Sequence, residues 1–204
     1  NIEGTFGNEV TFQGDRLESY YDDVSGQYYG IYFQQAMSST INHAIIRNGT
    51  SGIHLYSEDN ANTDYTLIVT NTEIYNNASY GLLLYSGARV KAENCVIAKN
   101  GIHALIVLEG GDFNFNNCHL LGYGNGDNTG SAVGISNYFV DQLNSVTNIG
   151  SINEGTISNS IIYGNLEQEI ILDTISDIAV TLNFDMRDNH IRSEVIPTDP
   201  FFID

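Results

Sequence analysis

The sequence predicts an all-β solenoid, a parallel β-helix of about seven coils that forms one domain over residues 1–204. Three observations predict this fold. A short phrase recurs at a nearly fixed period, its apolar residues alternate with a period of two, and the period lengthens only where turns are expected. A stacked coil tolerates such insertions because its strands keep their register while the loops bulge outward.

The repeated phrase has apolar or small residues four and two positions before an Asn, and an Ile or Leu three positions after it. Its clearest copies are Leu67-x-Val69-x-Asn71-x-x-Ile74, Val90-x-Ala92-x-Asn94-x-x-Ile97 and Phe113-x-Phe115-x-Asn117-x-x-Leu120. Weaker copies centre on Gly14, Asn42, Asn159 and Asp188. The alternation predicts a strand before each centre. Asn suits a bend because it tolerates left-handed geometry, so we expect a ladder of Asn side chains along one corner.

A further strand is expected eleven residues after the centre. Its copies are Ile53–Leu55, Leu82–Leu84, Leu105–Val107 and Ile170–Leu172. Insertions are expected at residues 57–65, 122–130 and 137–152. A leucine-rich repeat also has an Asn after alternating apolar residues, but it needs a helical segment in each repeat, and no segment here has helical periodicity.

The rungs "VTNTEIYNN", "AENCVIAKN" and "ISNSIIYGN", together with the lead-in "GNEVTFQGDRLESYYDDVSGQYYGIYF", resemble the right-handed parallel β-helix repeat proteins of Bacteroidota cell surfaces, which share the pectate-lyase-like superfold. The resemblance implies a secreted or lipid-anchored protein at the extracellular or outer-membrane surface, and it implies no particular reaction. It also implies a fragment of a longer chain. Residues 199–204, "DPFFID", resemble the opening of a closing segment, and further coils are expected before Asn1.

The charge balance limits the classes of partner. The chain has 7 basic and 25 acidic residues, a formal net charge of −18. Nucleic acids and anionic membranes are excluded as partners because binding them requires clustered Lys and Arg. Neutral glycans, cations and proteins remain. No apolar run approaches the length of about 20 residues that a transmembrane helix needs.

An apolar and aromatic row is expected on the outward side of the further strand. The residues that we single out as a candidate binding surface are Tyr32, His54, Tyr56, Leu83 and Tyr85. Three interpretations are open: the long loops at 122–130 or 137–152 cover the row, the row is a protein interface, or it is a platform on which sugars stack.

One insertion is a candidate cation site. Its oxygen-bearing residues stand at alternate positions, Glu58, Asn60, Asn62 and Asp64, and Ca²⁺ binds six to eight such oxygens. The loop lacks the Gly and the closing Glu of an EF-hand, so a solvated acidic loop is the competing interpretation. No other cofactor is expected.

Cys95 and Cys118 occupy the same position in neighbouring coils and are expected to stack. The spacing between coils permits a disulfide. Thr72 and Ser160 hold the equivalent position in other coils, which favours a row of small buried residues and hence free thiols.

The sequence favours a non-catalytic module that presents a binding or assembly surface to a glycan or a protein. The alternative is a polysaccharide lyase or glycoside hydrolase. A glycoside hydrolase needs two carboxylates on one face, roughly 5–9.5 Å apart. The outward rows predict no two carboxylates on neighbouring coils, and the basic residues are scattered along the chain.

Overall fold

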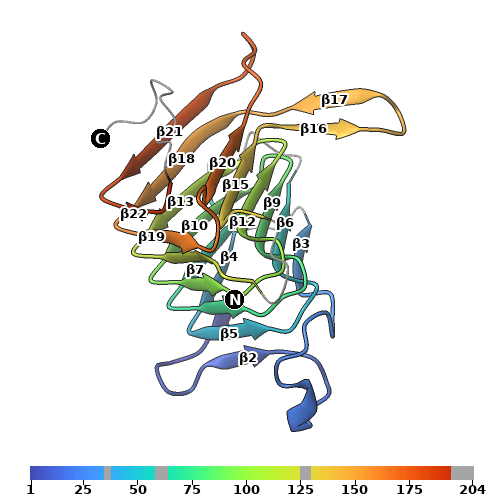
Figure 1. The fold of residues 1–204 in the computed structure, drawn as a ribbon, viewed down its shortest axis with the longest axis vertical. Helices are drawn as coiled ribbons and strands as arrows, with labels where there is room; N and C mark the ends of the chain where they lie inside the picture. The colour runs from blue at the N-terminus through green and yellow to red at the C-terminus, as the bar shows by residue number, and fades with distance from the viewer. Residues whose placement is uncertain (35–37, 58–63, 125–129, 194–204) are drawn as a thin grey trace.

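The chain folds as a right-handed parallel β-helix of about seven coils (Figure 1), as the sequence predicts. The computed structural model describes residues 1–34, 38–57, 64–124 and 130–193. Each complete coil contributes one strand to each of three parallel sheets. Within the described residues, the one short helix is the 3-10 turn η1 (Ser19–Tyr21), and no helix has the length and apolarity that a membrane crossing needs.

Three sheets stack the coils in register. The first sheet contains β1 (Ile2–Glu3), β4 (Ser39–Asn42), β7 (Leu67–Thr70), β10 (Arg89–Glu93), β13 (Asp112–Asn116), β18 (Ile152–Ser158) and β21 (Leu182–Arg187). The second sheet contains β2 (Val10–Phe12), β5 (Ala44–Arg47), β8 (Glu73–Tyr75), β11 (Val96–Ala98), β14 (His119–Gly122), β19 (Ile161–Gly164) and β22 (His190–Ile191). The third sheet contains β3 (Ile31–Gln34), β6 (Ser51–Tyr56), β9 (Tyr80–Tyr85), β12 (His103–Leu108), β15 (Val133–Ser136) and β20 (Ile170–Asp173).

The core lies inside the coils, where the inward residues of all three sheets pack together. Its largest fully buried side chains include Phe113, Phe115, Ile97 and Leu84. The strand β13 shows the alternation clearly, because Phe113 and Phe115 point inward while Asn114 is partly exposed on the outer face. Burial of these apolar rows is the main force that closes each coil.

The bend between the first and second sheets is made by one residue in left-handed geometry. Asn71, Asn94, Asn117 and Asn159 have φ between 50° and 55°. The Nδ2 group of Asn94 donates to Oδ1 of Asn71 at 3.3 Å, and Asn71 donates to Asn42 at 2.9 Å. The predicted Asn ladder is therefore present along this part of the corner.

Two of the weaker copies of the phrase were placed wrongly. The bend of the second coil is His43, with φ of 50°, because Asn42 pairs with Thr70 as the last residue of its strand. The copy centred on Gly14 is also wrong, because Val10–Phe12 pairs with β5 and belongs to the second sheet.

The residue after the bend closes the corner with a short hydrogen bond in several coils. Thr72, Cys95, Cys118 and Ser160 each donate from a hydroxyl or thiol to the carbonyl two residues earlier. Cys95 and Cys118 are buried free thiols, as predicted. The neighbouring Cys118 thiol, together with burial, raises the pKa of Cys95.

The insertion at 137–152 contains an antiparallel hairpin that the repeat pattern did not predict. It consists of β16 (Tyr138–Asp141) and β17 (Val146–Ile149), and it extends away from the stacked coils (Figure 1). The hairpin follows β15 directly in the sequence, so its base lies beside the outer face of the third sheet.

Candidate functional site

The outer face of the third sheet carries the row that the sequence singled out. The paired strands place Tyr32, His54 and Leu83 in one line along the solenoid, and Tyr56 and Tyr85 in the next line. Tyr32 is 53% exposed, and the other four side chains are half-buried. The five residues therefore do form one continuous surface, which from here on is called the aromatic row.

Neighbouring rings in the aromatic row pack against one another. Tyr56 and Tyr85 are stacked with their centroids 5.6 Å apart, and the ring of His54 lies edge-on to Tyr32 at 4.6 Å. Burial lowers the pKa of His54. Among the described residues its Nε2 atom has no hydrogen-bond partner. Because the stacked tyrosines use ring faces on each other, the row offers less flat aromatic surface than its composition indicates.

The hairpin covers the later coils of this face. Phe139 on β16 packs edge-to-face with Tyr85, with 5.6 Å between the ring centroids. Tyr138 donates its hydroxyl to Asp173 on β20 at 2.7 Å. Exposure falls to 8% at Ile106 beside the hairpin, whereas Tyr32 at the other end of the face stays open. Covering by the 137–152 loop, one of the three interpretations, is thus found at Tyr85, whereas Tyr32 is exposed.

A groove of about 340 Å³ lies between the hairpin and the third sheet. Its lining is mainly aliphatic and aromatic: Ile106, Leu108, Ile135, Phe139, Val140 and Ile171. The polar residues at its margins are His103, Ser136, Tyr138 and Asp173. Pockets with this balance, apolar walls and a few polar groups, are the usual form of binding sites. This surface is called the hairpin groove below.

Gly134 is one of the residues that line the hairpin groove. It occupies the outward position between Ile106 and Ile171 in the paired strands, so the line of side chains is interrupted there. The ring edge of His103 that carries Cε1 and Nε2 faces this glycine. Sequence reasoning missed β15 because Gly134 breaks the apolar triplet that marked the other copies of this strand.

His103 supplies a neutral imidazole to the margin of the groove. Its Nδ1 donates to the carbonyl of Ser131 at 2.7 Å, and its ring stacks on Tyr80 with centroids 6.0 Å apart. Burial lowers the pKa of His103, and the hydrogen bond to Ser131 partly opposes this. With Nδ1 carrying the proton, Nε2 is left as a hydrogen-bond acceptor on the edge that faces Gly134.

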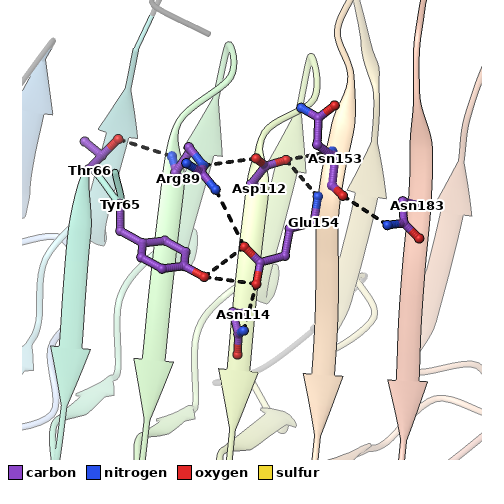
Figure 2. A network of polar contacts seen from close by, with 8 residues as sticks. All are labelled: Tyr65, Thr66, Arg89, Asp112, Asn114, Asn153, Glu154 and Asn183. Carbon is purple, nitrogen blue, oxygen red and sulfur yellow. Dashed lines mark hydrogen bonds and ion pairs between the residues drawn. The ribbon is translucent and has the colours of Figure 1, made fainter. Parts of the chain in front are cut away.

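A second polar arrangement lies on the outer face of the first sheet (Figure 2). Arg89 is at its centre, 18% exposed, with Nε 3.0 Å from Asp112 and Nη2 3.6 Å from Glu154. The guanidinium also lies over the ring of Tyr65 at 5.2 Å. Tyr65 donates its hydroxyl to Glu154 at 2.8 Å, and Asn114 donates to the same carboxylate at 2.8 Å.

This arrangement corrects the expectation that no two carboxylates meet on neighbouring coils. Asp112 and Glu154 lie on the paired strands β13 and β18, and both bind Arg89. Asp112 accepts two backbone hydrogen bonds, from Asn153 at 2.7 Å and Glu154 at 3.0 Å. Every carboxylate oxygen therefore has a partner within the protein, which is typical of a structural clamp.

Tyr65 keeps its proton in this clamp. Burial raises its pKa to about 12, and the hydrogen bond to Glu154 acts in the same direction. The phenol is thus a fixed hydrogen-bond donor at neutral pH. A general acid would instead need a group that releases its proton near the working pH.

The candidate Ca²⁺ loop lies mostly outside the described residues. Glu58, Asn60 and Asn62 are not described, and Asp64 is exposed. Within the described ranges, no group of three or more His, Cys, Asp or Glu side chains is arranged to hold a metal ion.

Comparison with known proteins agrees with the architecture. A family model described as a right-handed beta helix region matches residues 4–141, more than half of the chain. No curated protein and no solved structure matches the chain. The match, the three parallel sheets and the stacked coils lead to one conclusion: the chain belongs to the right-handed β-helix family.

Proposed function

We propose that the chain is a non-catalytic binding module, secreted or held at the cell surface, whose hairpin groove and adjoining aromatic row bind a segment of a protein partner. The observation that carries the proposal is the groove of about 340 Å³ with largely aliphatic walls under a projecting hairpin. Apolar side chains of a partner would be desolvated there.

A protein segment suits this surface better than a stacked sugar. Tyr56 and Tyr85 use their ring faces on each other, and Phe139 packs against Tyr85. The walls at Ile106, Val140 and Ile171 are the kind of surface that accepts Leu, Ile or aromatic anchors. The margin residues His103 and Asp173 supply an acceptor and a charge that fix the orientation of a bound chain.

The test uses a library of random twelve-residue peptides displayed on phage, selected against the folded protein. We expect enrichment of apolar and aromatic peptides. Their binding should be lost in Ile171→Asp, because a carboxylate would enter an apolar wall, and weakened about tenfold in the double variant Tyr56→Ala, Tyr85→Ala.

The matched control for this test is Thr156→Val on the first sheet, which should bind the peptides as the wild type does. The double variant should lower the unfolding free energy by only about 1 kcal/mol, because both rings are half-buried. Absence of enriched peptides, or peptide binding that survives Ile171→Asp, would refute the proposal. Loss of folding in the double variant would show that the row is core.

The second candidate function is polysaccharide cleavage, and the observation in its favour is the meeting of Asp112 and Glu154. Its test is the release of reducing ends or unsaturated products from a panel of polysaccharides, compared between the wild type and Glu154→Gln. We expect no release by either protein, because Arg89, Tyr65 and Asn114 occupy the oxygens of Glu154.

A further inference from the structure

A polar groove of about 440 Å³ crosses the outer face of the first sheet, away from the hairpin groove. All of its lining residues are polar or charged: Lys91, Glu93, Asn114, Asn116, Thr156, Ser158, Asn159, Arg187 and Asp188. They come from β10, β13, β18 and β21 and from the bends that follow β18 and β21, so the groove runs along the solenoid across four coils.

The strand register arranges this face as two rows of opposite polarity. One row runs Lys91, Asn114, Thr156, Asp185, and the other runs Glu93, Asn116, Ser158, Arg187. The charged residues stand at the two ends of the rows: Lys91 and Glu93 on β10, and Asp185 and Arg187 on β21. Asp188, at the bend after β21, adds one more carboxylate, so these five residues carry a net charge of −1. The middle two coils form a neutral floor of two amides and two hydroxyls.

Hydrogen bonds hold the amides of this floor in fixed orientations. Asn114 donates its Nδ2 group to Glu154 at 2.8 Å, which leaves its Oδ1 as an acceptor (Figure 2). Asn116 does the reverse, because its Oδ1 accepts from Ser158 at 3.2 Å and from Asn159 at 2.8 Å. The floor thus offers an acceptor, Oδ1 of Asn114, and a donor, Nδ2 of Asn116. Both lie on β13 and are already oriented.

Several polar groups of the groove have no partner within the described part of the chain. Lys91 forms no ion pair there, although Glu93 follows it on the same face. The Thr156 hydroxyl and the Nδ2 group of Asn116 make no hydrogen bond to a described residue. Asn114 is held in place by Glu154, which lies on the neighbouring strand β18.

We propose that this polar groove is a second binding site and that its ligand is a neutral, linear oligosaccharide. Sugar hydroxyls both donate and accept, so a fixed donor beside a fixed acceptor matches them, and the fixed orientations reduce the entropy lost on binding. The small net negative charge of the residues at its margin disfavours an anionic ligand and leaves a neutral one unaffected. The site goes beyond the proposed protein-binding function and is independent of it.

The test is isothermal titration calorimetry with four neutral hexasaccharides, namely maltohexaose, cellohexaose, xylohexaose and mannohexaose, and with hexagalacturonate as the charged probe. At least one neutral hexasaccharide should bind, and hexagalacturonate should bind more weakly. Thr156→Val and Asn116→Leu should each raise the Kd about tenfold, because each removes hydrogen bonds to the ligand. Lys91→Met should also raise the Kd.

Thr70→Val is the matched control, because Thr70 lies on the same face one coil before the groove. It should leave the Kd unchanged. Thr156→Val keeps the shape of the side chain, so it tests the site even where Asn116→Leu unfolds the protein. No binding of any neutral hexasaccharide, equal losses in Thr70→Val and Thr156→Val, or tighter binding of hexagalacturonate would each overturn the proposal. The double variant Tyr56→Ala, Tyr85→Ala should keep saccharide affinity, which separates this test from that of the hairpin groove.

Discussion

The outer faces of the first and third sheets are built on the same coils and are chemically opposite. The first sheet presents amides, hydroxyls and charges that bind one another across neighbouring strands. The third sheet presents aromatic and aliphatic side chains, partly covered by a hairpin. Both faces are fastened to one apolar core. The difference shows that inward rows specify the scaffold, while outward rows and insertions are free to specialise.

The largest expected effect tests whether the first sheet's outer face stabilises the fold. Arg89→Met should lower the unfolding free energy by about 3 kcal/mol, because it leaves the buried Asp112 and the partly buried Glu154 without a cation. The measurement is urea denaturation followed by circular dichroism.

Arg187→Met is the matched control, because Arg187 pairs with Asp185 on the same face but its side chain is 63% exposed. We expect a cost of at most about 1 kcal/mol there. Equal costs for the two arginines would mean that the clamp at Arg89 adds no stability, and the contrast between the two faces would then rest on ligand binding alone.

A smaller effect is expected from the buried carboxylate that borders the third sheet. Glu169 is fully buried and accepts from the backbone N–H groups of Ala132 and Leu166, both at 2.7 Å. Glu169→Gln should cost about 1–2 kcal/mol at neutral pH, because one of these donors loses its acceptor. Glu167→Gln, an exposed neighbour, should change the unfolding free energy little.

The same residue gives a pH dependence with a defined sign. Burial raises the pKa of Glu169, against the opposing effect of the two N–H donors and Arg192. The folded chain therefore holds this proton more tightly than the unfolded chain, and the contribution of Glu169 to stability falls as the pH rises through the raised pKa. Denaturation curves measured over that range should show this slope in the wild type and not in Glu169→Gln. The same slope in both proteins would contradict the prediction.

Much of the fold could be predicted because its signals are local. Period-two alternation identified the inward residues Phe113 and Phe115, and the recurring Asn identified the corner. The error at Asn42 arose because the true bend, His43, is its neighbour and lacks the Asn that marks other coils. The Gly14 copy failed because the sequence pattern of a strand does not say which sheet it joins.

The candidate sites were harder to predict because they depend on which coils become neighbours. Asp112 and Glu154 each stand five residues before an Asn of the repeated phrase, Asn117 and Asn159, and they meet because β13 and β18 pair in register. The hairpin had a detectable signal, since Tyr138–Val140 and Val146–Ile149 are strand formers on either side of a polar turn. The hairpin covers the aromatic row at one end, and which end it covers depends on where the hairpin folds.

The smallest expected effect concerns the corner between the first and second sheets, where neighbouring coils make the same hydrogen bond. Cys118 donates its thiol to the Asn116 carbonyl at 3.3 Å, and Ser160 makes the same bond to Ser158 in the next coil at 2.7 Å. Cys118→Ser should therefore keep the bond and change the unfolding free energy by no more than about 0.5 kcal/mol. Cys118→Ala, which removes the donor from the same site, serves as the comparison and should cost more. If the serine variant is destabilised as strongly as Arg89→Met, the corner is not interchangeable between coils. Specialisation would then extend beyond the outward rows into the scaffold itself.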